Sequence, residues 1–188
     1  MFYETTAKTH VRVQPKSLNL PLKEAIFDSL TNSFQGYISP EVGFVINVTE
    51  ILKVGEGVII HGDGAPYYNT EFKFITFVPE MQELIVGKIT DITNFGAFLN
   101  MGPVDGMIHV SQTMDDYINF SKTKTLTGKQ SKKVLKVGDK CKARVIAISY
   151  KDLTNPKIGL TMRQPHLGNI NWVDEVVKKK VIKKGSKK

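Results

Sequence analysis

Short runs of β-branched and other apolar residues dominate the segment from Leu84 to Met162. Asn-Phe-Gly, Met-Gly-Pro, Asp-Gly and Val-Gly-Asp breaks separate these runs. Such runs, bounded by turn-forming residues, predict the strands of a small antiparallel barrel. We expect five strands, at residues 84–92, 95–101, 104–109, 139–149 and 157–162.

The first part of the chain predicts a strand followed by a helix. Residues 2–14 alternate loosely between apolar and polar and favour a strand, which Pro15 ends. A stripe of apolar residues then recurs every fourth position, as on one face of a helix that begins near Pro21. Its members are Leu22, Ile26, Leu30 and Phe34. Gly36 is expected to end this helix.

Further β-rich runs follow, at residues 42–52, 57–60 and 71–78. In the first run, Phe44, Ile46 and Val48 are expected on one face because strand side chains alternate. In the last run, Phe72, Phe74 and Val78 are expected to share a face in the same way. The fold class is therefore α+β: a small domain with one helix on an antiparallel sheet, then the barrel.

Domain limits follow from these patterns. We expect an N-terminal α+β domain over residues 1–82, the barrel over residues 83–164, and a C-terminal helix with a Lys-rich tail over residues 165–188. Asn171 is expected to cap that helix.

Charge divides the chain in two. The formal net charge of the chain is +8. Residues 1–83 hold 6 Lys/Arg and 10 Asp/Glu, a net charge of −4. Residues 84–188 hold 20 Lys/Arg and 8 Asp/Glu, a net charge of +12. The barrel contains a basic insertion at 117–136 with no acidic residue, expected to be an exposed, mobile loop or loose hairpin. A basic half suggests a polyanionic partner, and an acidic half suggests a different one. A solvated surface with a Lys-rich tail would give the same composition.

The residues that could carry catalysis do not form a convincing site. His109, Ser111 and Asp115 are close in sequence, but no nucleophile elbow accompanies them. The four histidines lack metal-ligand spacing, and the single cysteine, Cys141, excludes a disulfide framework or a Cys-rich zinc site. No run of 18 apolar residues is present, so we expect no membrane span and a cytoplasmic protein. No catalytic residue, metal or cofactor is predicted.

Aromatic residues at the second predicted strand are better candidates for binding. Phe95 and Phe98 would lie on opposite faces of a regular strand. A bulge at Gly96 would allow both rings to point outward. The competing interpretation places one ring, more readily Phe98, in the core.

Three stretches of the barrel carry a resemblance to a known family. They are Gly87-Lys88-Ile89, Asn94-Phe95-Gly96-Ala97-Phe98 and Gly106-Met107-Ile108-His109-Val110-Ser111. This pattern resembles the S1 RNA-binding domain, a five-stranded barrel of the OB-fold type, with a match of some 80 residues. The resemblance implies that Phe95, Phe98 and His109 face RNA, together with Asp152 and Lys157 near the last turn. Lysines of the basic insertion are expected beside them, namely Lys122, Lys124, Lys129, Lys132 and Lys133.

Motifs outside the barrel extend the resemblance to nearly the whole chain. They include Val42-Gly43-Phe44-Val45, His61-Gly62-Asp63-Gly64-Ala65, Phe77-Val78-Pro79-Glu80 and Leu160-Thr161-Met162-Arg163. Together they are similar to the E-prime subunit (subunit seven) of archaeal DNA-directed RNA polymerase. The resemblance implies a stalk subunit of this nucleotidyltransferase complex, with no catalytic residues, that supports transcription initiation and elongation. Its expected partners are the small helical F subunit (subunit four) in a heterodimer, the polymerase core and the emerging single-stranded RNA transcript.

The glycine-rich turn at residues 61–68 is a candidate for core docking. Gly62, Asp63, Gly64 and Tyr67 are the residues that we expect to contribute. A free-standing S1-domain RNA-binding protein of the translation or exosome type is the alternative interpretation. It would carry a different N-terminal domain.

Overall fold

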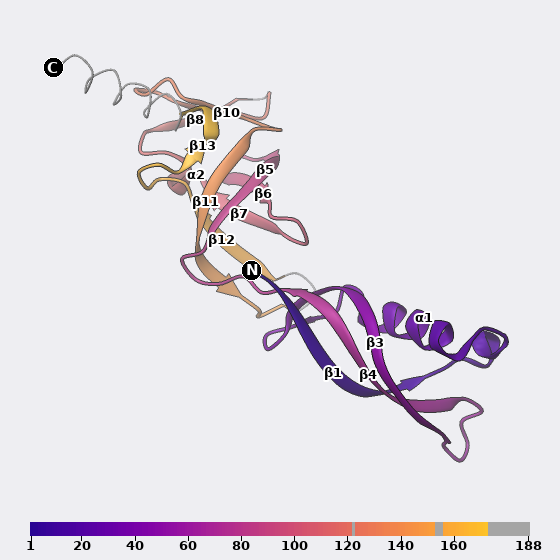
Figure 1. The fold of residues 1–188 in the computed structure, drawn as a ribbon. Helices are drawn as coiled ribbons and strands as arrows, with labels where there is room; N and C mark the ends of the chain where they lie inside the picture. Colours follow the sequence, from indigo (N-terminus) through magenta and orange to yellow (C-terminus); the bar gives the residue numbers. More distant parts are fainter. Residues whose placement is uncertain (122, 153–155, 173–188) are drawn as a thin grey trace. The chain divides into compact units, whose positions relative to one another are not determined.

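The computed structural model describes residues 1–121, 123–152 and 156–172. The chain divides into two compact units, an N-terminal unit, Met1–Val78, and a C-terminal unit that begins at Pro79 (Figure 1).

The N-terminal unit is an antiparallel sheet with one α-helix. Its elements are β1 (Phe2–Arg12), the 3-10 helix η1 (Pro15–Asn19), α1 (Leu22–Phe34), β2 (Ile38–Ser39), β3 (Gly43–Ile59) and β4 (Pro66–Phe77). The strand order is β1-β4-β3-β2, so β1 is an edge strand. The predicted first strand and helix are confirmed.

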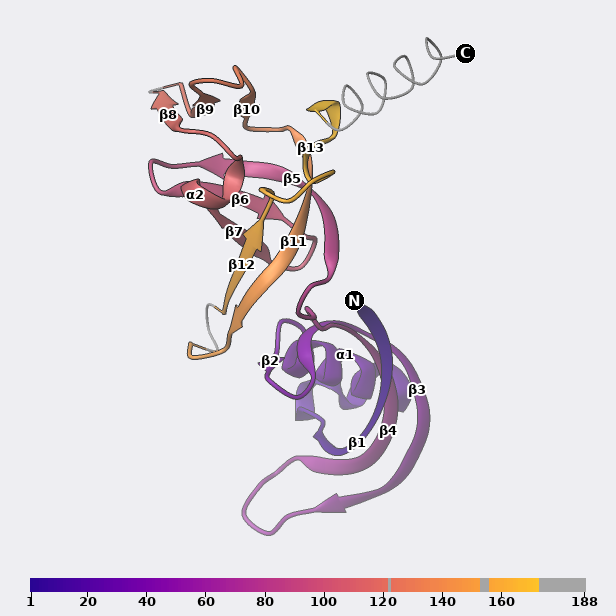
Figure 2. The same cartoon turned by 90° about the vertical axis from the view of Figure 1, so that its left-hand side faces the viewer.

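Helix α1 covers one face of the sheet, inside its curve (Figure 2). Ile26 and Leu30 of the predicted stripe are fully buried, whereas Leu22 in the first turn is 42% exposed. They pack on strand residues that include Val45, Val48, Phe72 and Phe74. Gly36 follows the helix with φ +77°, a left-handed conformation that favours glycine at a helix end.

Strand β3 differs from the prediction in its faces. Its pairing with β4 shifts at four places, the first between Val45 and Asn47. Each such irregularity reverses which residues face the helix. Val45 and Val48 therefore share the core, Ile46 is only partly buried, and Phe44 packs on Phe77 with ring centroids 6.2 Å apart. The expected common face of Phe44, Ile46 and Val48 was wrong.

The C-terminal unit contains the predicted barrel. Its elements are β5 (Leu84–Ile92), β6 (Gly96–Asn100), β7 (Asp105–His109), α2 (Val110–Thr113), β8 (Ile118–Ser121), β9 (Thr125–Gly128), β10 (Val134–Lys136), β11 (Lys140–Ser149), β12 (Lys157–Thr161) and β13 (Gly168–Asn169). The order β12-β7-β6-β5-β11-β13, with a further β11–β12 pairing, closes five strands into a barrel. All five predicted strands are present, with bounds within two residues of those expected.

Alternate residues of each strand fill the barrel. On β11, Cys141, Ala143 and Val145 are fully buried, while the residues between them face outward. Burial raises the pKa of the Cys141 thiol to about 12. The cysteine is thus a small apolar core residue.

The basic insertion is a folded three-stranded sheet, which corrects the expectation of an exposed, mobile loop or loose hairpin. Strands β8, β9 and β10 form a three-stranded antiparallel sheet, in which Leu126 and Leu135 are fully buried. Asp116 fastens the turn after β9, because its carboxylate accepts hydrogen bonds from the backbone N–H groups of Gln130 (2.9 Å) and Ser131 (2.7 Å). These hydrogen bonds lower the pKa of Asp116, and the bond from the Ser131 backbone makes the largest contribution.

The part of the predicted C-terminal helix that follows Trp172 lies outside the described residues. Within the described part, the side-chain oxygen of Asn169 accepts a hydrogen bond from the backbone N–H of Asn171 at 3.0 Å. Asn169, rather than Asn171, thus occupies the capping role.

Candidate nucleic-acid interface

Two aromatic rings meet on the outer surface at the start of β6. Phe95 lies in the turn before the strand and is 46% exposed. Phe98 points outward because its neighbours Ala97 and Leu99 are fully buried in the barrel. The two ring centroids are 6.2 Å apart, with the rings nearly perpendicular at 88°. The expectation of two outward-facing rings therefore agrees with the structure.

The reason for this arrangement is not the expected bulge at Gly96. The register between β6 and β7 is regular, with Gly96 opposite His109. A Cβ at Gly96 would collide with the carbonyl oxygen of Ile108, so glycine permits close approach of β7. The irregularity lies in β5, between Ile89 and Asp91.

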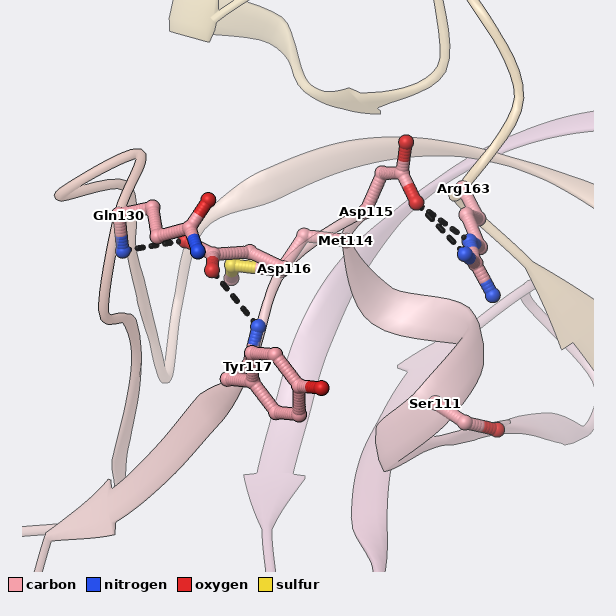
Figure 3. A pocket seen from close by; sticks show the side chains of 7 residues that line it. All are labelled: Ser111, Met114, Asp115, Asp116, Tyr117, Gln130 and Arg163. Carbon is pink, nitrogen blue, oxygen red and sulfur yellow. Dashed lines mark hydrogen bonds and ion pairs between the residues drawn. The ribbon is translucent and has the colours of Figure 1, made fainter.

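His109 lies beside this aromatic pair, at the end of β7. Its Nδ1 atom is 2.8 Å from the Ser111 hydroxyl and accepts from the Ser111 backbone N–H at 3.3 Å. Asp115 does not complete a triad. Its carboxylate instead accepts from Nη2 (2.6 Å) and Nε (2.9 Å) of Arg163, as Figure 3 shows. The histidine–serine contact therefore orients the imidazole at a helix start, without a charge partner for nucleophilic catalysis.

Asp152 and Lys157 are exposed on either side of the turn that joins β11 to β12. Because β7 and β12 run parallel with Met107 opposite Gly159, His109 aligns with Thr161, four residues beyond Lys157. Four strand residues span about 13 Å. Lys157 is thus on the same barrel but at the far end of the neighbouring strand.

The lysines of the basic insertion do not form one group. Lys124 reaches the aromatic face, where its Nζ atom lies 2.8 Å from the carboxylate of Asp91, the residue opposite Phe98 in the sheet. This contact lowers the pKa of Asp91. Lys133 lies over the ring of Trp172, with 5.5 Å between Nζ and the ring centroid. Lys129 and Lys132 are exposed, and Lys122 lies outside the described residues.

A cavity of about 400 Å³ lies next to His109, between α2 and the three-stranded sheet. Figure 3 shows its lining residues, which are Ser111, Met114, Asp115, Asp116, Tyr117, Gln130 and Arg163. Tyr117 is 74% exposed at its rim. Sequence reasoning missed Tyr117 and Arg163 as possible surface contacts, although an exposed aromatic at the start of a basic insertion could have indicated the first. In the parts of the chain that the structure describes, no three His, Cys, Asp or Glu side chains gather as metal ligands.

Comparisons with known proteins cover both units. A family model described as the SHS2 domain found in the N terminus of Rpb7p/Rpc25p/MJ0397 matches residues 8–64, and the S1 RNA binding domain model matches residues 78–153. DNA-directed RNA polymerase subunit Rpo7 of Saccharolobus solfataricus is 37% identical over 180 residues, which are 95% of this chain and 100% of that protein. The chain belongs to the Rpo7 family of DNA-directed RNA polymerase subunits. Rpo7 of Sulfolobus acidocaldarius is similar at 36% identity, over 95% of this chain and 98% of its own length.

Membership of the Rpo7 family confirms the resemblance to polymerase subunit seven. It also confirms the expectation of a subunit of DNA-directed RNA polymerase. RNA polymerase III subunit rpc8 of Schizosaccharomyces pombe is a more distant relative, 31% identical over 96 residues, or 51% of this chain and 47% of that protein. The SHS2 match in the N-terminal unit does not fit a free-standing S1 protein. No helix in the described ranges is long and apolar enough to cross a membrane.

In this Rpo7-family chain, the glycine-rich turn between β3 and β4 is fixed by an ionic contact. Arg12 binds the carboxylate of Asp63 through Nη2 (2.7 Å) and Nε (2.9 Å), and the Tyr67 hydroxyl donates to it at 2.7 Å. Hydrogen bonds from Arg12 and then Tyr67 hold the pKa of Asp63 well below its ordinary value. Asp63 and Tyr67 therefore shape the turn, whereas Gly62 and Gly64 have open space around them.

Exposed apolar side chains precede this turn at the end of β3. Val58, Ile59 and Ile60 are 59%, 73% and 52% exposed. The sequence analysis identified this segment only as a β-rich run and did not single out these residues as surface contacts. Adjacent exposed side chains of this size commonly indicate a protein contact.

Proposed function

We propose that this chain is a stalk subunit of DNA-directed RNA polymerase that supports initiation and elongation by holding the emerging single-stranded transcript on its S1 barrel. The observation that carries the proposal is the outward-facing pair of Phe95 and Phe98 beside His109, on a barrel matched by the S1 model. Exposed rings stack on bases of any sequence, and nearby lysines attract phosphates. The outer face of β6 and β7 is thus suited to RNA binding without sequence preference.

Polymerase subunit four is the proposed heterodimer partner. Strand β1 supports this proposal, since it lies at the sheet edge over eleven residues and an edge strand can pair with another chain. Addition of subunit four to the purified chain should raise the melting temperature and reduce self-association at high protein concentration. A chain that stays monomeric when concentrated, and melts at the same temperature with and without subunit four, would contradict this pairing.

The polymerase core is the proposed partner of the tip between β3 and β4, formed by residues 58–67. Gly64→Phe offers a sharp test, because nothing lies within 4 Å of a Cβ added at this position and its φ is not positive. This variant should recover less polymerase core in co-purification from cells, while RNA binding by the purified chain stays unchanged. Equal loss of both activities would indicate misfolding, and full recovery of the core would overturn docking through the tip.

Co-purification also tests the proposed function as a whole. Tagged wild-type chain should recover the catalytic core subunits and subunit four from cells. Recovery of ribosomal or exosome components in their place would favour the free-standing S1 alternative.

A further inference from the structure

The outer face of β11, which β5 separates from β6, carries a row of cations. On β11, Lys140, Lys142 and Arg144 alternate with the buried residues. Lys140 is exposed and Lys142 half-buried on the outer face, whereas the Nε atom of Arg144 is buried and has no hydrogen-bond partner among the described residues. Their partners on β5 are Lys88, Val86 and Leu84, respectively, none of which is acidic. On the other side, Gly168 lies opposite Lys142. No neighbouring strand position in this register neutralises the row.

The pair of Lys140 and Lys88 is informative. The two lysines are exposed and directly opposite each other in adjacent antiparallel strands. Like charges in such a pair destabilise a sheet. A bound anion would relieve this repulsion, as would screening by salt.

Trp172 extends the row to a basic cavity. A Cβ at Gly168 would lie 2.9 Å from the ring of Trp172, so the ring covers the outer side of β13 next to Lys142. The ring in turn lies under the ammonium group of Lys133. The cavity beside Trp172, of about 400 Å³, is also lined by Lys132 and Lys136. Asp139 is the single acidic residue that lines the cavity. Its carboxylate already accepts hydrogen bonds from the Lys136 backbone N–H at 2.9 Å and from the Asn169 side chain at 2.8 Å.

From this juxtaposition we infer a second RNA-binding surface, in which the row on β11 and the cavity beside Trp172 bind the phosphate backbone of a single strand. This inference rests on the proposed RNA-binding function and adds a site to it. Lys140 pairs with Lys88 on β5, and Lys88 pairs with Asn100 on β6, two residues along the strand from Phe98. Two strand spacings across the sheet and two residues along it give a separation of about 12 Å between Lys140 and Phe98. An RNA strand that stacks on Phe95 and Phe98 continues across β5 to reach the row, within the 4–16 nucleotides that an OB fold covers.

The double variant Lys140→Gln/Lys142→Gln tests the second surface, since both side chains face away from the core. The probes are oligouridylates of about 6 and about 16 nucleotides, chosen from the range of OB-fold site sizes. For the longer probe, the slope of log K against log salt should become shallower by about 1.4, or about 0.7 for each phosphate that the protein no longer neutralises. When the salt concentration rises three-fold, both proteins lose affinity for the longer probe, and the loss in the variant should be about five-fold smaller than the loss in wild type. The slope for the shorter probe should change by less, because fewer of its phosphates extend from the aromatic face onto the row.

The matched control removes the same charge from the other unit. Lys8 and Lys53 are both exposed in the N-terminal unit, and Lys8→Gln/Lys53→Gln should leave both slopes unchanged. An unchanged slope for the longer probe in the β11 variant would overturn the second surface. If that variant instead lost salt-sensitive association with the polymerase core or with subunit four, the row would be a site for an acidic protein. Failure of the proposed function is distinguishable, because wild type would then bind neither probe, or Phe95→Ala would leave binding of the shorter probe intact.

Discussion

Replacement of Phe95 by Ala tests whether RNA stacks on the aromatic pair. A base stacked on an aromatic side chain gains about 1–3 kcal/mol. Phe95 is 46% exposed and its ring lies edge-to-face with that of Phe98, so we expect the lower end, about 1 kcal/mol or a five-fold rise in Kd. Stacking displaces no counterions, so the loss should be the same at every salt concentration. Fluorescence anisotropy with a labelled oligouridylate, measured at several salt concentrations, gives both the affinity and the slope.

Two comparison variants make this result interpretable. Tyr37→Ala removes an aromatic of similar exposure, 51%, from the N-terminal unit and should leave RNA binding unchanged. Lys124→Gln removes the partner of Asp91 beside Phe98, and should weaken binding and make the slope shallower by about 0.7. Wild-type affinity in Phe95→Ala, combined with a large loss in the lysine variant, would refute stacking and leave phosphate contacts as the whole interaction.

Three further predictions concern stability and reactivity. Because the pKa of Asp63 is depressed below its ordinary 3.8, its contacts stabilise the fold above that pH. The difference in melting temperature between wild type and Asp63→Asn should thus be constant near neutral pH and shrink progressively below about pH 4. A difference that does not change with pH would contradict this reasoning. Leu135→Ala should lower the free energy of unfolding of the C-terminal unit by about 2–5 kcal/mol, measured in urea by the fluorescence of the single tryptophan, Trp172. Leu84→Ala, at a site in the same unit that is 52% exposed, should change this free energy by less than about 0.5 kcal/mol. The buried Cys141 thiol, with its pKa raised to about 12, should react with a thiol reagent only after denaturant is added, and rapid reaction of the native chain would show that the barrel opens there.

The barrel could be predicted from sequence because its signals are local. Each strand is a short apolar run, and each break contains a residue that favours a turn. The basic insertion could not be predicted in this way. Its sheet depends on two buried leucines, Leu126 and Leu135, nine residues apart, and on hydrogen bonds from a turn to the distant carboxylate of Asp116. Neither signal is periodic, and six lysines without an acid are typical of a mobile, unfolded segment.

The glycine at position 96 shows why two outward-facing rings were predicted correctly for an incorrect reason. Glycine in a strand indicates either a bulge or a close approach of another backbone, and one sequence does not distinguish the two. Both alternatives place Phe95 outside the regular strand, so both allow two outward rings. The alternatives differ for His109, because only close approach brings β7 directly against Gly96 and sets the imidazole beside the aromatic pair. It follows that Gly96→Ala should disturb His109 as well as the rings: the added methyl group pushes β7 away from β6, so histidine NMR resonances should shift together with those of Phe95. A change confined to the phenylalanine resonances would favour a local bulge after all.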